Sequence, residues 1–401
     1  MEVLGIIVEY NPLHNGHLYH LEESIKLTKC QYVVAVMSGN FVQRGEPAIV
    51  DKWKRAEMAL KAGIDLVIEL PVVYATSTAE NFAYGAVKLL DSLKVIDCIA
   101  FGSEEGDLEK LSKIADILLE EPPDYKRALK ENLGKGLTFA KARELALVKV
   151  TGDESISKTL QTSNNILGIE YLKALKKIKS SIVPFTIKRR GALYTSLKLE
   201  GEFASATSIR KAIKEKGIKA VKNYVPDFTL KILERAFKEG QGPVYLQDFS
   251  PIILYLLRSG HPLENIFDVA EGIDNKIYKA ASKTSNIKDL IKLTKSKRYT
   301  ESRIRHILLH LLLKIDKKLF KEFDGPNYIR VLGFSEKGKT ILKEIKKKTE
   351  LPIITKVAQY KSKIEDSRMF ERDLFATDVY TLAYKNFAIS KLDFFHPIIK
   401  L

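Results

Sequence analysis

The chain has 401 residues, 45% hydrophobic and 29% charged, the composition of a globular protein with about two to three domains. It contains no run of about 18 apolar residues, and polar residues begin at Glu2, so we expect neither a membrane-spanning helix nor a secretory signal. Its 66 Lys and Arg residues exceed its 50 Asp and Glu residues, which gives a formal net charge of +16. The two cysteines, Cys30 and Cys98, fit a reducing cytoplasm and are expected as buried thiols.

The first hundred residues alternate between two sequence patterns. Short, continuous apolar runs predict buried parallel strands, and the longer segments between them have the apolar spacing of helices. Strands that alternate with helices predict an α/β fold with a Rossmann-like, doubly wound parallel sheet. The predicted strands are residues 3–8, 32–37, 66–70 and 97–101, and the predicted helices are 17–28, 52–62 and 79–90.

The rest of the chain is predicted to be mainly helical. One more strand is expected at 181–187, and a loop that ends at Pro226 marks a domain boundary. We therefore predict a catalytic domain at residues 1–225 and a mainly helical, basic domain at residues 226–401. Further helices are predicted within 108–148, at 162–175, at 206–214 and, as an amphipathic helix, at 300–314, with a strand–helix–strand unit at 328–334, 337–347 and 353–357.

The positive charge is concentrated in the second half of the chain. Residues 1–100 have a net charge of −3, whereas residues 276–321 have a net charge of +11. Such a basic segment is typical of a surface that binds the phosphates of nucleic acid. A lysine-rich surface adapted to high temperature is the alternative explanation, and charge alone does not separate the two.

Two histidines, His14 and His17, follow the first predicted strand in the segment NPLHNGH at residues 11–17. This turn lies at the carboxyl end of a parallel strand, where open α/β sheets bind ligands. The helix N-terminus there favours phosphate, and Gly16 lets a nucleotide approach the backbone closely. We therefore predict that both histidines bind nucleotide phosphates and stabilise negative charge during attack on the α-phosphate. Ordinary surface or capping histidines are the alternative.

This strand–HxGH–helix arrangement resembles the HIGH-motif nucleotidyltransferase superfamily, which joins the α-phosphate of ATP to an acceptor and releases pyrophosphate. The second motif of the superfamily, ISSTxIR, resembles the segment ASATSIR at residues 204–210, in which alanines replace the isoleucine and one serine. The resemblance implies that Ser205, Thr207 and Arg210 bind the β- and γ-phosphates at a helix N-terminus. A simple capped helix is the alternative.

Longer blocks resemble the tRNA(Met) cytidine acetate ligase family across most of the chain. They are GIIVEYNPLHNGH at 5–17, MSGNFVQRGEPA at 37–48, FGSE at 101–104, SNNILG at 163–168 and IKRRGA at 187–192. The resemblance implies a two-step ligase. Acetate and ATP give acetyl-adenylate and pyrophosphate, and the acetyl group then passes to N4 of the wobble cytidine in elongator tRNA(Met).

The same resemblance implies where ATP binds. Gly102 would follow the fourth predicted strand, where a larger side chain would obstruct the nucleotide, and Asn165 would read the adenine edge, with a helix cap as its alternative. Arg189 and Arg190 would reach phosphate or tRNA. The full implied ATP set is Gly5, Ile6, Ile7, Val8, Glu9, Tyr10, Asn11, Pro12, Leu13, His14, Asn15, Gly16, His17, His20, Gly102, Asn165, Arg189 and Arg190.

The loop after the second predicted strand is expected to face the same crevice. It contains Asn40, Gln43 and Arg44, which we predict to bind the substrate, because Arg is a natural bidentate partner for a carboxylate such as acetate. A structural salt bridge between Glu46 and Arg44 is the alternative. The helix that follows begins with basic side chains, for which we predict a solvated face or a rim for RNA, namely Lys52, Lys54 and Arg55.

The basic segment 276–321 includes Tyr299, and basic residues with an interleaved aromatic ring suit phosphate tracking and base stacking. His306 and His310 have a spacing that can hold a metal, but no Cys or carboxylate partner accompanies them. We therefore predict ordinary core or surface histidines and no metal site. The predicted RNA-binding residues are Lys295, Lys297, Arg298, Arg303 and Arg305.

The predicted function is that of an ATP-dependent acetate ligase, with acetate and elongator tRNA(Met) as its partners, in the cytoplasm. Mg²⁺ is expected with ATP, because the triphosphate needs a counter-ion. An adenylyltransferase that makes a coenzyme or another small activated metabolite is the first alternative, and the basic segment argues against it. A non-catalytic RNA-binding protein is the second alternative, and the intact HxGH motif argues against it.

Overall fold

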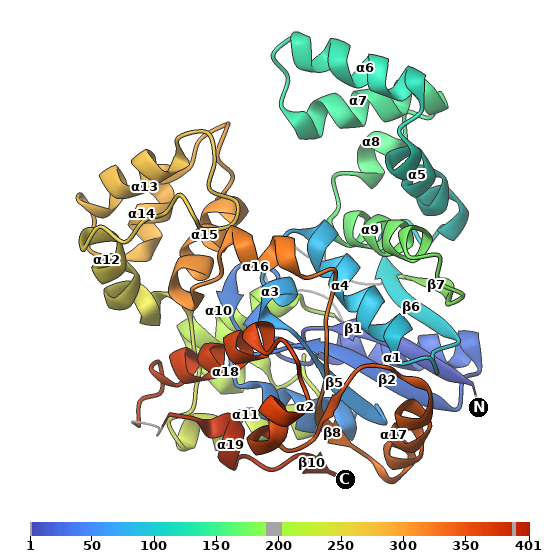
Figure 1. Cartoon of the computed structure of the whole chain (residues 1–401), viewed down its shortest axis with the longest axis vertical. Helices are drawn as coiled ribbons and strands as arrows, with labels where there is room; N and C mark the ends of the chain where they lie inside the picture. Colours follow the sequence, from blue (N-terminus) through green and yellow to red (C-terminus); the bar gives the residue numbers. More distant parts are fainter. Residues whose placement is uncertain (1, 190–202, 387–389) are drawn as a thin grey trace.

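The computed structural model describes residues 2–189, 203–386 and 390–401, and it is organised around one eight-stranded sheet (Figure 1). The strands are β1 (Val3–Val8), β2 (Tyr32–Ser38), β5 (Leu66–Leu70), β6 (Cys98–Ser103), β7 (Val183–Lys188), β8 (Ile329–Phe334), β9 (Ile353–Ile354) and β10 (Ile399–Lys400). Their order is β10-β8-β5-β2-β1-β6-β7, and β9 pairs with β8 off this path. Every pairing in the sheet is parallel except that between β5 and β8.

The predicted α/β fold with a doubly wound parallel sheet is confirmed. From β1 the chain adds β2 and β5 on one side, and it then returns to add β6 and β7 on the other side. In doubly wound sheets, ligands bind at the carboxyl ends of the strands that flank such a reversal. The loops after β1 and β6 therefore mark the expected place of a ligand site.

Helices cover both faces of the sheet, because successive residues of a strand point to opposite sides. In β2, Val33 and Ala35 belong to one apolar core, whereas Val34 and Val36 belong to the other. The first core includes residues of α1 (Asn15–Thr28), α2 (Lys52–Lys61), α10 (Ala206–Lys216) and α11 (Asp227–Lys238). The second includes residues of α4 (Ala79–Ser92), α9 (Ser163–Lys177) and α17 (Glu336–Lys348).

The C-terminal part of the chain returns to this sheet. β8 runs antiparallel to β5, with Arg330 opposite Glu69, and β9 and β10 flank β8. The predicted strand–helix–strand unit thus extends the first sheet, and the boundary predicted at residue 225 does not mark where the sheet ends. The reason is that β7 and β8 belong to the same sheet, although the helices from α10 to α16 lie between them in the sequence.

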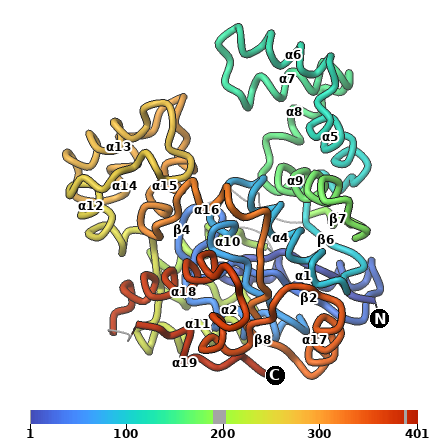
Figure 2. The backbone as a smooth tube through the Cα atoms, viewed as in Figure 1, coloured from blue at the N-terminus to red at the C-terminus, as the bar shows by residue number. Residues whose placement is uncertain are grey.

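Two groups of helices project beyond the sheet (Figure 1, Figure 2). One consists of α5 (Leu108–Glu120), α6 (Pro123–Gly134), α7 (Phe139–Thr151) and α8 (Ile156–Thr159), and the other of α12 (Ser250–Arg258), α13 (Ile273–Ala281), α14 (Ile287–Thr294) and α15 (Glu301–Leu313). The prediction that the last of these helices is amphipathic is wrong. Its residues from 306 to 313 are all buried, because α12, α14 and α18 (Arg368–Thr381) pack around it.

Short elements complete the described part of the chain. They are β3 (Phe41–Val42), β4 (Glu46–Pro47), α3 (Val72–Ala75), α16 (Lys317–Glu322), α19 (Leu392–Phe395) and three turns of 3₁₀ helix at Ile218–Val221, Leu246–Phe249 and Val357–Ser362. Within the described ranges, no helix has the length and apolar character needed to cross a membrane.

Lys52 and Arg55, near the start of α2, are fully buried, so the prediction of a solvated basic face is wrong for them. Lys52 Nζ donates to both carboxylate oxygens of Glu69 at 2.9 Å and lies 2.8 Å from Asp393 Oδ1. A buried charge is strongly unfavourable unless it is paired. The two carboxylates therefore explain how Lys52 can lie in the core, and they join α19 to the central sheet.

Arg55 connects the loops after β1 and β2 through backbone carbonyls. Its Nη1 donates to the carbonyls of Glu9 (2.7 Å) and Ser38 (2.9 Å), its Nη2 donates to that of Gly39, and its Nε donates to that of Val50 (3.1 Å). Backbone carbonyls that are buried in loops need such donors. Arg55 therefore fixes the carboxyl ends of the two strands relative to each other.

We predict that Arg55→Lys lowers the free energy of unfolding by about 3 kcal/mol, because one ammonium cannot replace the planar fork that serves four carbonyls. Chemical denaturation measures this loss. The matched control is Lys61→Ala at the exposed end of the same helix, which should change the free energy by less than about 0.5 kcal/mol. An equally stable Arg55→Lys protein would contradict the role given to Arg55.

Candidate active site

The loop after β1 places two imidazole rings against each other at the start of α1. His14 is the N-cap of this helix, and its ring stacks on that of His17 with 3.6 Å between the centroids. The backbone N–H of His14 donates to His17 Nδ1 (3.3 Å), so the neutral His17 ring carries its proton on Nε2. Tyr10 packs edge-on against His17, with 5.1 Å between the ring centroids. The HxGH motif is therefore a packed, ordered turn.

Burial keeps these imidazoles neutral at pH 7. Burial, together with the charges of Arg189 and Arg210, lowers the pKa of His14 to about 3. Burial and Arg189 lower the pKa of His20 to about 4, and burial lowers the pKa of His17 well below its ordinary value. An anion bound beside the rings would raise these pKa values, because it favours the imidazolium. The site is thus set to respond to negative charge.

Two ring nitrogens at this site have unused hydrogen-bonding capacity. His14 Nδ1 and His20 Nε2 are buried and have no hydrogen-bond partner among the described residues. Buried polar atoms normally have partners, so both nitrogens suit a ligand that accepts hydrogen bonds. Arg189 follows β7 and lines the same small pocket, together with Gly16, Tyr19 and Phe203. The pocket therefore combines neutral donors with a cation, which suits phosphate oxygens.

Gly16 and Gly102 leave the space that this pocket needs. A Cβ atom on Gly16 would lie 3.1 Å from His14 Cε1. A Cβ atom on Gly102 would lie 3.3 Å from Arg189 Cγ and 3.5 Å from His20 Cδ2. A side chain at position 16 would therefore press on the His14 ring, and one at position 102 would press on Arg189. Obstruction of the nucleotide by a side chain at position 102 stays a prediction.

Most of the other residues in the predicted ATP set support the loop and do not line this pocket. Asn11 Oδ1 accepts from the N–H of Ile49 (2.7 Å), and Asn15 Nδ2 donates to the carbonyl of Asn223 (3.0 Å). Leu13 is buried in the core. Direct contact with ATP stays a prediction for these members, which are Gly5, Ile6, Ile7, Val8, Glu9, Tyr10, Asn11, Pro12, Leu13 and Asn15.

Asn165 fixes the loop after β6. Its Oδ1 accepts from the N–H of Glu105 (3.0 Å), and its Nδ2 donates to the carbonyl of Thr159 (3.2 Å). The side chain is buried, and both of its polar atoms are engaged within the protein. A structural role accounts for these contacts, while contact with adenine stays a prediction. Arg190, the other arginine of the predicted ATP set, lies outside the described residues.

The second motif forms the start of α10. Ser205 is the N-cap and accepts from the N–H of Ser208 (3.1 Å), as the capped-helix alternative requires. Arg210 donates to the carbonyl of Asn11 (2.9 Å) and pairs with Glu46. Arg210 thus ties α10 to the HxGH loop. Through its ion pair with Glu46, Arg210 also ties α10 to β4. Thr207 and Arg210 also line a larger groove beside the site.

This groove has a volume of about 860 Å³ and lies between the loop after β2, the start of α9 and helix α15. Gln43 and Arg44, two of the three predicted substrate residues, line it, and so do Arg303 and Arg305 from α15. The groove therefore brings residues of the predicted substrate loop beside two of the five predicted RNA-binding residues, although more than 250 positions separate them in the sequence.

The third predicted substrate residue, Asn40, makes contacts within the protein, and its contact with substrate stays a prediction. It is buried, its Oδ1 accepts from the N–H of Lys52 (2.8 Å), and its Nδ2 donates to Thr377 (3.2 Å). Gln43 is also well anchored, because its N–H donates to Glu9 Oε1 (2.8 Å) and its carbonyl accepts from His306 Nε2 (2.6 Å). Contacts of Gln43 and Arg44 with substrate stay predictions.

The predicted RNA-binding residues divide into two groups. Lys295, Lys297 and Arg298 are exposed beside α15, whereas Arg303 and Arg305 are mostly buried in the groove wall. Arg305 pairs with Glu301 (2.9 Å). Lys295, Lys297 and Arg298 are therefore accessible to a large partner such as RNA. Arg303 and Arg305 can instead contact a ligand that enters the groove.

His306 and His310 are core histidines, as predicted. His310 Nε2 donates to the carbonyl of Thr76 (2.9 Å), and burial lowers the pKa of His310 to about 3. In the part of the chain that the structure describes, no group of three or more His, Cys, Asp or Glu residues could hold a metal ion. Cys30 and Cys98 are buried free thiols, which agrees with the expectation from their number.

Sequence reasoning missed several residues of the groove. Thr78, Ser163 and Asp268 line it from three different segments. None of them belongs to a motif with Arg44 or Arg210, so only the folded arrangement reveals that they are neighbours.

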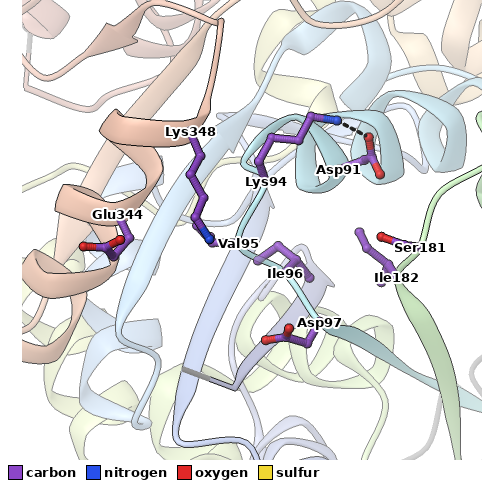
Figure 3. Close-up of a pocket in the computed structure, with 9 residues that line it drawn as sticks. All are labelled: Asp91, Lys94, Val95, Ile96, Asp97, Ser181, Ile182, Glu344 and Lys348. Atoms are coloured by element: carbon purple, nitrogen blue, oxygen red, sulfur yellow. Dashed lines mark hydrogen bonds and ion pairs between the residues drawn. The ribbon is translucent and has the colours of Figure 1, made fainter.

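A separate hollow, away from the nucleotide pocket and the groove, lies at the opposite, amino-terminal edge of the sheet (Figure 3). It is lined by residues that precede β6 and β7, including Asp97, whose carboxylate accepts from the N–H of Val3 (2.7 Å). Lys94 and Asp91 pair with each other at 3.1 Å. Because these charged groups are engaged structurally, and because ligands bind at the other edge of such sheets, this hollow is not the candidate site.

Comparison with known proteins places this geometry in context. A family model described as HIGH Nucleotidyl Transferase matches residues 1–393. The tRNA(Met) cytidine acetate ligase of Caldanaerobacter subterraneus subsp. tengcongensis is 99% identical over 401 residues, the full length of both chains. The protein of the same name from Thermoanaerobacter sp. strain X514 is 73% identical, also over the full length of both.

Solved structures of a relative agree. The crystal structure of Thermotoga maritima TmcAL in its apo form is 40% identical in sequence, covers 100% of both chains and superposes with a TM-score of 0.96. The crystal structure of the same protein bound with alpha-thio ATP covers 100% of both chains with a TM-score of 0.94.

The buried, neutral state of His14 has a consequence for stability. In the unfolded chain His14 takes up a proton near pH 6.5, but in the folded protein it does so only near pH 3. Acidification between these values therefore favours unfolding. We predict that the loss of unfolding free energy between pH 7 and pH 5 is about 2 kcal/mol smaller in His14→Asn than in the unmodified protein. Denaturation at both pH values measures it, and an unchanged loss would contradict the burial effect.

Proposed function

Because the chain belongs to the tRNA(Met) cytidine acetate ligase family of HIGH nucleotidyl transferases, we propose that it acetylates N4 of the wobble cytidine in elongator tRNA(Met), using acetate and ATP. The observation that carries this proposal is a pair of buried nitrogens, His14 Nδ1 and His20 Nε2, which lie beside Arg189 at the reversal of strand order and have no hydrogen-bond partner among the described residues. The relative from Thermotoga maritima has been crystallised with an ATP analogue, which supports ATP as the nucleotide.

The proposed reaction has two steps. An acetate oxygen attacks the α-phosphorus of ATP, the bond to the bridging oxygen of the β-phosphate breaks, and pyrophosphate leaves. N4 of the cytidine then attacks the acetyl carbonyl carbon, AMP leaves, and the amine loses a proton. The acceptor base has to leave the anticodon stack to reach the acetyl group.

The residues of the HxGH turn stabilise the negative charge of the reacting phosphate. Negative charge develops on the phosphate oxygens during the first step, and donors fixed beforehand stabilise it without reorganisation. The stacked rings of His14 and His17, with Arg189, supply such donors, and the N-terminus of α1 adds the positive end of its dipole. A rise in the histidine pKa values on binding would strengthen the effect.

Mg²⁺ is proposed to arrive with ATP. Phosphate oxygens and water would supply most of its ligands, because Mg²⁺ usually keeps several waters and few protein ligands at nucleotide sites. A tRNA substrate and two free buried thiols fit the proposed cytoplasmic location.

We predict that His14→Ala lowers the rate of acetylation at least about 100-fold, because it removes a donor to the reacting phosphate. Affinity for tRNA should change less than about twofold, since the exposed basic residues lie in another part of the molecule. His261→Ala, outside this pocket, is the control and should leave both quantities unchanged. Equal loss of tRNA binding and turnover in His14→Ala would contradict separate nucleotide and RNA sites.

We predict that Lys297→Glu with Arg298→Glu weakens tRNA binding about 10-fold or more and lowers the salt dependence of the affinity, because fewer counterions are released. Filter binding at several salt concentrations measures both effects. The matched control reverses Lys343 and Lys346 on the exposed face of α17. An equal effect in the control would assign the result to net charge and not to this surface.

A further inference from the structure

A second hollow shares a wall with the groove at the active site. Asp268 and Arg303 line both, and the second hollow continues along Phe267, Phe320 and Lys321, with a volume of about 590 Å³. We propose that this second hollow binds the base of the nucleotide that follows the acceptor cytidine. The inference rests on the proposed function, and it adds a base-specific contact beyond the acceptor itself.

The hollow has an aromatic wall. The rings of Phe267 and Phe320 stack with 3.9 Å between their centroids and 23° between their planes, and both are half-buried. A rigid pair of stacked rings offers a face to a nucleobase at little entropic cost, and stacking on aromatic side chains is how proteins bind unstacked bases. Phe320 also lies 6.0 Å from the buried ring of His310, so its position is fixed from behind.

Asp268 supplies an acceptor that no other carboxylate of the groove can supply. Glu46 pairs with Arg210 and lies 3.8 Å from Arg305, and Glu301 pairs with Arg305 at 2.9 Å. The carboxylate of Asp268 has neither a hydrogen bond nor an ion pair with any residue that the structure describes.

Because the Asp268 carboxylate is half-buried, a ligand that donates a hydrogen bond to it is favoured over water. Burial raises the pKa of its carboxyl group, although His306 and Arg303 oppose the effect. The carbonyl of Asp268 accepts from Arg303 Nε (3.2 Å), which holds the residue in place between the two hollows. A carboxylate in such a wall can accept a hydrogen bond from the exocyclic amine of a base, as Asp and Glu do in nucleic-acid recognition.

The surrounding charge suits RNA. Lys321 is exposed at the rim, and Lys317 donates to the carbonyls of Glu264 (2.6 Å) and Val269 (2.9 Å) while it lines the hollow. With Arg303, three cations face one carboxylate, so a phosphodiester beside the base would be attracted. Because the two hollows adjoin, consecutive nucleotides can occupy them.

The base at this position follows from the genetic code. The methionine codon AUG is read by the anticodon CAU, so adenosine follows the wobble cytidine. Adenine carries an exocyclic N6 amine, which is the donor that Asp268 requires. The second hollow would thus read the base next to the one that is modified.

The test uses anticodon stem-loop RNA in which this adenosine is either kept or replaced by purine riboside, which lacks the N6 amine. The enzyme variants are Asp268→Gly and the matched control Glu121→Gly. Both carboxylates occupy backbone conformations with positive φ, 66° and 45°, where glycine fits without strain. Glu121 lines neither of the two hollows. The readouts are kcat/KM for acetylation, the dissociation constant for ATP and the thermal midpoint.

We expect the unmodified enzyme and Glu121→Gly to prefer the adenosine substrate by about 10- to 100-fold, the value of a hydrogen bond to a charged group. Asp268→Gly should treat both substrates alike and should bind ATP normally. Phe320→Ala should raise KM for both substrates about 10-fold. Retained preference in Asp268→Gly, or no preference in the unmodified enzyme, would overturn the inference. Absence of any acetylation by the unmodified enzyme would instead overturn the proposed function.

Discussion

The active site depends on one buried guanidinium. Arg55 donates to four backbone carbonyls, and three of them lie at the carboxyl ends of β1 and β2: Glu9 and Gly39 follow the strands, and Ser38 is the last residue of β2. Because the carbonyls at these ends cannot all be satisfied by regular sheet bonding, the loops that follow keep their positions only while the donor is present. Arg55 therefore fixes the distance between the HxGH turn and the loop that contains Gln43 and Arg44. A residue that lines neither the nucleotide pocket nor the groove thus sets the geometry of both.

The chemistry depends on the neutral histidines of the pocket. His14, His17 and His20 are neutral because they are buried near Arg189, and two of their nitrogens have no partner among the described residues. A triphosphate would supply the missing acceptors and the negative charge together. Binding would therefore give partners to buried nitrogens that the fold leaves without them. Such an unfavourable cluster is typical of a ligand site.

The sequence predicted the sheet well because its strands carry their own signal. Continuous apolar runs at 3–8 and 32–37 required helices on both faces, and the HxGH segment required a place at a carboxyl edge. It could not predict that β8 joins β5, since no local pattern records which strand a distant segment pairs with. It failed at Lys52 and Arg55 because basic residues are ordinarily exposed, and no local pattern records which carboxylates and backbone carbonyls surround them in the fold. The groove was not predicted for the same reason, because its residues come from segments that meet only in the fold.

The most direct test of the account is the acetate-dependent exchange of labelled pyrophosphate into ATP, measured without tRNA and with it. The account predicts exchange that requires acetate and disappears in the His14→Ala protein, because a carboxylate is activated at the α-phosphate beside the HxGH turn. No exchange under either condition would contradict acetyl-adenylate formation at this site. Exchange that persists unchanged without acetate would show that another acceptor is adenylylated there.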